Sequence, residues 1–221
     1  MKKTLLTAIA LLYFMVVSGQ GFGVQLGFNV SKFKSWEKGE RLPNVSFISH
    51  YPIKSVNFGV NYDYEVADHL FFKGGLLFIR QGLKILTEGE GGISSDGKEL
   101  DLTGTFKINY LYFPVALKYN IEIADEVYIA PSLGMYLGFA MGGELEVDNG
   151  ESSNTEKLKF GSSSNSHFKS GDMGLMLQTS LLYKNFELGI VYLAGTSDIV
   201  PDKDNVTKNS SFGILLGYRF F

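Results

Sequence analysis

The C-terminal stretch SFGILLGYRFF, residues 211–221, decides the fold. Successive side chains of an extended strand point to opposite faces, so Phe212, Ile214, Leu216, Tyr218 and Phe220 share one face. The other face holds glycines, a leucine and an arginine. An unbroken apolar face that ends in aromatic residues is typical of a barrel in the bacterial outer membrane, where lipid contacts the apolar side. The stretch therefore predicts a membrane-spanning strand that closes such a barrel.

The N-terminus has the features of a secretory signal peptide. Lys2 and Lys3 form a positive n-region, residues 5–17 form an apolar h-region, and Val17 and Gly19 occupy the small-residue positions of a cleavage site. We therefore expect residues 1–19 to be a signal peptide and residues 20–221 to be one outer-membrane barrel domain. An uncleaved anchor is the alternative, and the lack of a stop-transfer flank argues against it.

The composition narrows the class of protein further. There is no cysteine, which excludes a lipoprotein anchor, disulfides and cysteine metal sites. The 20 basic and 23 acidic residues leave a net charge of −3, which argues against a nucleic-acid binder. The 18 phenylalanines, 12 tyrosines and 26 glycines fit membrane strands with aromatic girdles and a crowded lumen.

Alternation with a period of two residues indicates eight strands, at about residues 21–32, 55–66, 69–86, 106–121, 127–142, 172–183, 186–195 and 211–221. In residues 127–142 every odd position is apolar, and the even positions are small residues and two tyrosines. A barrel of about eight strands has room inside only for side chains, so small and large residues must mix there. The expected fold is all-β, an eight-stranded antiparallel transmembrane β-barrel.

The connections between these strands fall into two classes. Those at residues 67–68, 122–126 and 184–185 are short, and those at 33–54, 87–105, 143–171 and 196–210 are long. This alternation predicts short periplasmic turns and long extracellular loops, with both termini in the periplasm. Pro114 and Pro131 lie inside strands and cannot donate to a ladder, so we expect a local bulge near the 122–126 turn.

Residues 110–119, YLYFPVALKY, resemble the Tyr/Leu-x-x-Pro-apolar-x-x-Lys-Tyr segment of PorT-type outer-membrane barrels. The resemblance extends to the glycine-rich strand before this segment and to residues 128–134 after it. It implies an eight-stranded barrel, a signal peptide and a place in the outer membrane. The name of that family also carries an association with protein secretion.

The sequence gives no catalytic, cofactor-binding or metal-binding residues. The serine-rich stretch 162–166 precedes His167, which allows a Ser–His hydrolase acting on lipid. A flexible Ser/Asn/Gly loop explains the same stretch, and the chain has no nucleophile-elbow pattern. Residues 202–205 lack the remaining ligands of a calcium loop. We therefore predict a protein that is not an enzyme and needs no cofactor.

Charged residues carry the candidate sites. The alternation points six of them into the lumen near the periplasmic ends of the strands, where isolated charges would cost several kcal/mol and must therefore pair. These are Asp63, Glu65, Lys73, Lys118, Glu187 and Arg219. Their network is expected to close the bore to water and ions. Three residues near the outer rim, Arg80, Lys84 and Lys107, are candidates for contacts with lipopolysaccharide phosphates or for ordinary interfacial snorkelling.

The function expected from these features is non-enzymatic. It is a binding, envelope-structural or secretion-accessory role of an outer-membrane barrel whose lumen is plugged. A small passive channel, a lipid-modifying enzyme and a soluble lipocalin-like barrel are the alternatives, and the outward apolar faces argue against the last. The expected partners are outer-membrane lipids, the barrel-assembly machinery during insertion and an unidentified envelope protein, with no nucleic acid.

Overall fold

The computed structural model describes residues 21–37, 48–93, 99–163, 165–201 and 205–220, so the expected signal peptide lies outside the described residues. Its regular elements are strands: β1 (Phe22–Glu37), β2 (Ile48–Ala67), β3 (Leu70–Ile93), β4 (Glu99–Tyr119), β5 (Ile121–Ala124), β6 (Val127–Asp148), β7 (Ser153–Lys157), β8 (Gly171–Tyr183), β9 (Phe186–Gly195) and β10 (Asn205–Arg219). No helix long and apolar enough to cross a membrane occurs in this described part.

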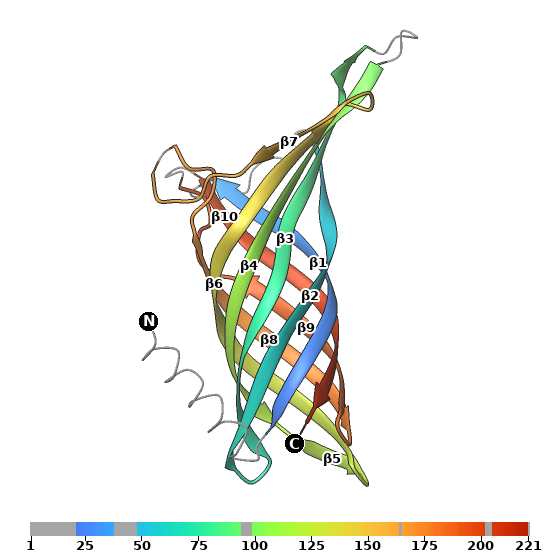
Figure 1. The fold of residues 1–221 in the computed structure, drawn as a ribbon, viewed down its shortest axis with the longest axis vertical. Helices are drawn as coiled ribbons and strands as arrows, with labels where there is room; N and C mark the ends of the chain where they lie inside the picture. The colour runs from blue at the N-terminus through green and yellow to red at the C-terminus, as the bar shows by residue number, and fades with distance from the viewer. Residues whose placement is uncertain (1–20, 38–47, 94–98, 164, 202–204, 221) are drawn as a thin grey trace, which may run out of the picture.

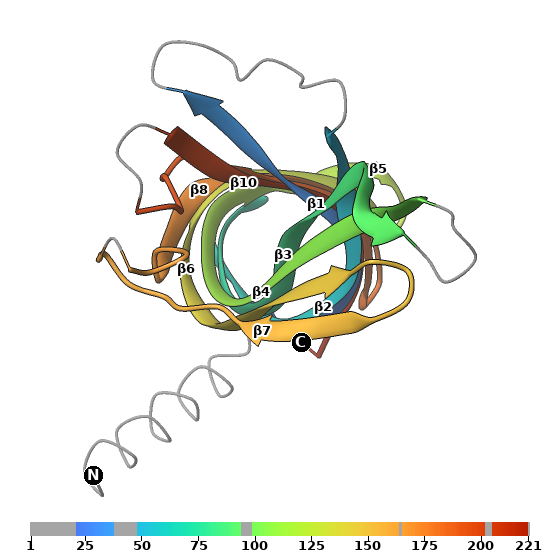
Figure 2. The same cartoon turned by 90° about the horizontal axis from the view of Figure 1, so that it is seen from above.

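The strands form a closed antiparallel barrel, seen from the side in Figure 1 and from above in Figure 2. The ring runs β1–β2–β3–β4–β6–β8–β9–β10, and β10 pairs with β1 to close it. The short β5 continues the line of β4, and the short β7 pairs only with β6. Eight strands therefore make the wall, which confirms the predicted eight-stranded antiparallel barrel.

The wall is apolar outside and carries a mixture of polar, small and apolar residues inside. Along β8 the side chains alternate strictly between exposed and buried. The large outward residues are uncovered, as the 61% exposure of Leu133 and the 64% exposure of Met141 show. The inward side holds buried asparagine, serine, glutamine and charged residues. This arrangement inverts that of a soluble barrel, because the apolar face has no protein to cover it.

The two ends of the barrel differ in their connections. At the end that we call the turn end, two-residue turns at 68–69, 125–126 and 184–185 join the strands. At the opposite loop end, β3, β4 and β6 extend well beyond the other strands, and β7 lies beside them (Figure 1). Strands thus continue into segments predicted as loops. Outside a membrane a paired strand needs no apolar face, so these extensions lack the alternation that marks the wall.

Both strand prolines interrupt pairing. β4 pairs with β6 as far as Lys118, and pairing resumes at Ile121 as β5. The gap lies at Pro131, which has no N–H to donate. The pairing of β3 with β4 also breaks off beside Pro114. The register is unchanged across both gaps, and a register shift between Glu122 and Ala124 confirms the bulge predicted near the 122–126 turn.

Candidate functional site

Four charged side chains meet inside the turn end of the barrel. Lys118 of β4 forms an ion pair with Asp63 of β2. Lys73 of β3 forms a second ion pair with Glu187 of β9, with Nζ 3.1 Å from Oε1. All four residues are at most 5% exposed. Buried charges are stable only when paired, so each of these four charges depends on its partner.

Neutral groups complete this turn-end network. The side-chain amide of Gln178 and the hydroxyl of Ser180 each donate to Oε1 of Glu187 at 2.7 Å. The Lys118 ammonium lies 4.9 Å from the centre of the Phe71 ring, within the range of a cation–π contact. Glu187 therefore has three donors, whereas the only partner of the Asp63 carboxylate among the described residues is Lys118.

Two predicted members lie outside this network. Glu65 is exposed at the turn end of β2, beside a register shift in the β2–β3 pairing, and forms no ion pair with a described residue. Arg219, the last residue of β10, donates from Nη2 to the backbone carbonyl of Lys184 at 2.7 Å. The predicted ion pairing was wrong for both residues: Glu65 is exposed at the strand end, and Arg219 keeps the inward phase of Leu215 but bonds to a backbone carbonyl.

A second polar cluster surrounds Asp172, near the loop end. Its carboxylate is 3% exposed and accepts hydrogen bonds from Tyr112 at 2.6 Å, Asn209 at 2.8 Å and Ser197 at 3.0 Å. Tyr136 lies at 3.3 Å. No described cation pairs with this carboxylate, so neutral donors from β4, β6, β10 and the β9–β10 loop hold it. The sequence reasoning missed Asp172, although the residue shares the inward phase of Gln178 on the same strand.

Glycines make room for the tyrosines of this Asp172 cluster. The rings of Tyr112 and Tyr136 are stacked with their centres 4.3 Å apart. A Cβ atom added to Gly138 would overlap the Tyr112 ring, and one added to Gly174 would lie 2.6 Å from the Tyr136 hydroxyl. The sequence predicted a mixture of small and large inward residues. In the structure the small residues are glycines that lie directly against the tyrosine rings.

Apolar side chains from the loops fill the mouth of the barrel. This mouth plug consists of Leu158, Phe160 and Phe168 from the β7–β8 connection and Ile199 from the β9–β10 loop. The Phe168 ring centre lies 5.7 Å from that of Phe33 and 5.9 Å from that of Phe106. The plug is continuous with inward residues such as Ile108 and Tyr110 in one apolar core.

Polar contacts fasten the two plugging loops to each other and to the wall. The Lys169 ammonium pairs with Asp198 at 2.8 Å, and the backbone N–H of Lys169 donates to the Ile199 carbonyl at 2.7 Å. Ser197 bonds both to Asp172 and, through its hydroxyl, to the backbone N–H of Met173 at 2.8 Å. The loops are therefore built into the barrel mouth at several points.

Little space remains between the turn-end network and the mouth plug. A cavity of about 30 Å³ lies there, lined on one side by asparagines and glutamine of β1 and β2 and on the other by apolar residues of β3, β8 and β9. Such a volume holds about one or two water molecules. The asparagines are themselves engaged, since Asn57 donates to Asn29 and Asn29 donates to the Arg80 carbonyl, both at 3.1 Å.

The three basic rim residues differ in their surroundings. Lys107 is ion-paired with Glu144 at 3.8 Å and with Glu146 at 2.5 Å. Arg80 donates from Nε to the side-chain oxygen of Asn109 at 2.8 Å. Lys84 is exposed and forms no ion pair with a described residue. The charge of Lys107 is therefore neutralised by carboxylates of the protein. Of the three rim residues, only Lys84 has an exposed ammonium with no ion pair to a described residue, as the predicted contact with lipopolysaccharide phosphate requires.

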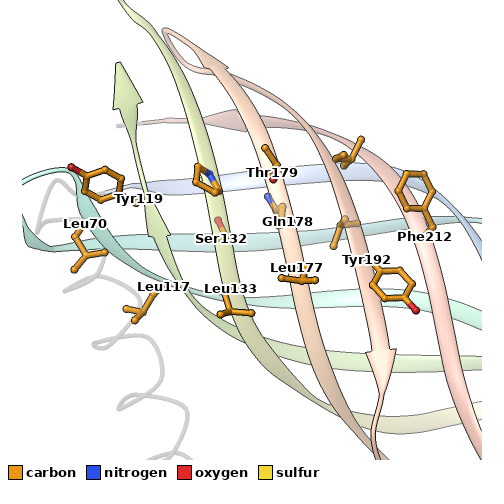
Figure 3. A pocket seen from close by; sticks show the side chains of 13 residues that line it. Leu70, Leu117, Tyr119, Ser132, Leu133, Leu177, Gln178, Thr179, Tyr192 and Phe212 are labelled. Atoms are coloured by element: carbon orange, nitrogen blue, oxygen red, sulfur yellow. The ribbon is translucent and has the colours of Figure 1, made fainter. Parts of the chain in front are cut away.

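A shallow hollow of about 380 Å³ lies in the outer wall, where β4, β6, β8 and β9 run side by side (Figure 3). Pro131 and Thr179 are opposite each other in the β6–β8 pairing and are small beside the surrounding leucines. The lining of this hollow is almost entirely apolar, so the hollow is part of the face that lipid chains contact.

The described residues show no assembled catalytic or metal centre. No group of three potential metal ligands occurs among them. His167 accepts a hydrogen bond from the backbone N–H of Lys159 at its Nδ1 atom, at 3.3 Å, and no described serine hydroxyl bonds to its ring. Residues 202–204 of the incomplete calcium-loop pattern lie outside the described part.

A closed antiparallel barrel with an apolar outer wall, a filled polar lumen and connections of two lengths defines a membrane β-barrel protein. The comparison with family models agrees. Residues 18–200 match the outer membrane protein beta-barrel domain, and the chain belongs to this family. The protein is therefore a β-barrel of the bacterial outer membrane, as predicted.

Solved structures of similar outline come from several bacteria. Ail, the attachment invasion locus protein of Yersinia pestis, is 19% identical, with 91% of this chain and 99% of that chain covered and a TM-score of 0.37. OprG from Pseudomonas aeruginosa is 13% identical, with coverages of 91% and 96% and a TM-score of 0.47. Neisserial surface protein A is 14% identical, with coverages of 90% and 97% and a TM-score of 0.35. No curated protein sequence matches the chain.

Proposed function

We propose that this protein is a closed outer-membrane barrel that acts through its surfaces, in envelope structure or in binding. In this proposal it neither conducts solutes nor catalyses a reaction. The observation that carries the proposal is that the lumen is filled at three levels: the turn-end network, the Asp172 cluster and the mouth plug. Among the described residues, a cavity of about 30 Å³ lies between them.

The barrel has no spare width for a pathway. A wall of about eight strands leaves an interior that side chains fill, whereas aqueous channels occur in barrels of 16–18 strands. An ion passing here would have to separate the Lys118–Asp63 and Lys73–Glu187 pairs. It would then have to displace Phe168 from the aromatic rings that it contacts. Each step uncovers buried charge or apolar surface, so passage is unfavourable at both ends.

Two further observations shape the proposal. The ring of His167 bonds to backbone rather than to a serine hydroxyl of the described loop, which favours a structural loop over a hydrolase. The PorT-type resemblance of residues 110–119 favours a secretion-accessory role as the form that binding takes. Contact with outer-membrane lipids and insertion by the barrel-assembly machinery belong to the same proposal.

Conductance of purified protein in planar bilayers tests this function. The unmutated protein should give no steady current, in membranes where a general porin inserted under the same conditions gives stable steps. Faster migration of the unboiled protein on a denaturing gel establishes that the sample is folded. A stable and reproducible open level from folded, unmutated protein would replace the proposal with a channel function.

A further inference from the structure

Lysines gather on the outward face of neighbouring strands, just beyond the apolar band on the loop-end side. We call Lys32 and Lys34 of β1, Lys54 of β2 and Lys84 of β3 the basic belt. All four side chains are exposed. On β1 the outward residue before the belt is Val30, and on β2 it is Val56. Val30 and Lys54 are direct partners in the β1–β2 pairing, so the belt begins where the apolar wall stops.

The lysines of this belt have no acidic partner in the part of the chain that the structure describes. Among the described residues no carboxylate forms an ion pair with any of its four lysines. Other lysines do have acidic partners: Lys73, Lys107, Lys118, Lys169 and Lys184. On the β4–β6 side, Glu144 and Glu146 both approach Lys107. Glu144 and Glu146 therefore neutralise Lys107, whereas the four belt lysines, like Lys157 and Lys159 at and just beyond the end of β7, have no acidic partner among the described residues.

A tyrosine positions one lysine of the belt at the boundary. The Lys34 ammonium lies 3.3 Å from the Tyr192 hydroxyl and 6.0 Å from the centre of its ring. The same hydroxyl lies 3.3 Å from Ser210 on β10. Tyrosine is enriched where a membrane protein passes from hydrocarbon to polar headgroups, because its ring is apolar and its hydroxyl polar. Tyr192 thus places the headgroup level at the height of the belt.

From this geometry we propose that the basic belt binds the phosphate groups of lipid A in the outer leaflet. A lysine ammonium pairs with phosphate as a point charge, and several on one face meet phosphates spread over neighbouring lipids. Snorkelling alone gives no reason for the lysines to gather on one side without acidic partners. The inference deepens the proposed envelope-binding role by naming its ligand, and it does not require a closed lumen.

Binding of lipid A to detergent-solubilised full-length protein tests the inference. The chain has one tryptophan, Trp36, which lies on β1 two positions from Lys34, so its fluorescence provides the titration signal. The test variant is K32Q/K34Q/K54Q. The matched control is K157Q/K159Q, which removes lysines at the end of β7 and beyond it, away from the belt. Native mass spectrometry counts the bound lipid independently.

We expect the triple variant to lose roughly a hundredfold in affinity, at about fivefold for each lysine, and the control to stay within about twofold. Added salt should weaken binding to the unmutated protein because it screens exposed charges. The inference is overturned if lipid A stripped of its phosphates binds as tightly, or if the triple variant binds within threefold of the unmutated protein. Equal binding of phosphatidylglycerol would reduce the belt to a general anionic-lipid surface and overturn the commitment to lipid A.

Two measurements distinguish loss of lipid A binding from misfolding of a variant and from an open lumen. Gel mobility of the unboiled protein shows whether each variant is folded, and K54Q alone serves as the test if the triple variant is not. Conductance of the same samples reports on the lumen. A conducting protein that still binds lipid A would refute the closed barrel and leave the belt in place, and the converse result would refute the belt alone.

Discussion

Replacing Lys118 with methionine tests how much the Lys118–Asp63 ion pair in the lumen contributes to the free energy of unfolding. Asp63 is 3% exposed, its Oδ1 atom has no described hydrogen-bond partner, and Oδ2 is paired with Lys118. Without the ammonium both oxygens would be buried with no donor. Stranding a buried charge in this way costs about 3–5 kcal/mol. We therefore expect Lys118→Met to lower the free energy of unfolding by about that amount.

The companion change Lys73→Met should cost less. Glu187 would still accept hydrogen bonds from Gln178 and Ser180, both at 2.7 Å, so its carboxylate keeps two donors. We expect a loss of about 1.5–3 kcal/mol, the range for a hydrogen bond to a charged group. Arg219→Met should cost less, about 0.5–1.5 kcal/mol, because the bond from Arg219 to the Lys184 carbonyl is exposed to solvent at the turn end.

A double-mutant cycle separates pairing from packing. Asp63→Asn in the Lys118→Met background removes the stranded charge, so the double variant should regain most of the lost stability. Urea unfolding of the protein in lipid vesicles, followed by tryptophan fluorescence, measures each corner of the cycle. The reasoning fails if Lys118→Met costs less than about 1 kcal/mol, or if the two changes are simply additive.

Three more predictions follow from the wall and its ends. Gly138→Ala should cost about 1–3 kcal/mol in urea unfolding because the new Cβ overlaps a stacked tyrosine, whereas Gly171→Ala, which meets nothing within 4 Å, should be nearly neutral. Deleting residues 218–221 removes the end of β10 that pairs with β1, and fractionation should then find the protein outside the outer membrane; normal insertion would contradict the closing role. A tag after Gly150 should be reached by antibody on intact cells and a tag in the 184–185 turn should not, and reversed labelling would invert the assigned topology.

The wall was predictable because lipid imposes a strict rule on it. Outward positions between the two headgroup layers are predominantly apolar, so the phase of each strand can be read from residues such as Leu133 or Ile214. The same phase correctly turned Asp63, Lys73, Lys118 and Glu187 inward. It failed for Glu65, where the β2–β3 register shifts, since alternation carries no information about a bulge.

The mouth of the barrel lay beyond sequence reasoning for a different reason. Leu158, Phe168 and Ile199 lie in connections without periodicity, so nothing in the sequence distinguishes a loop residue that packs inward from one that faces water. The Asp172 cluster joins residues from β4, β6, β8, β10 and a loop, and such convergence depends on strand stagger that single-strand patterns do not encode. The length of the loop-end strands was underestimated because polar hairpins outside the membrane have no apolar face.

The lumen of this protein does the work that a hydrophobic core does in a soluble domain. The outer wall gains nothing from burial against protein, so packing inside the barrel has to hold the strands in register. That demand explains why the lumen combines two different solutions. At the turn end two ion pairs link β2 to β4 and β3 to β9 across the bore. At the loop end an apolar core replaces them, and Asp172 marks the junction, with four neutral donors in place of a cation. Because the side chains of the lumen are used to hold the strands together, the rim and the loops are the surfaces that remain for binding other molecules.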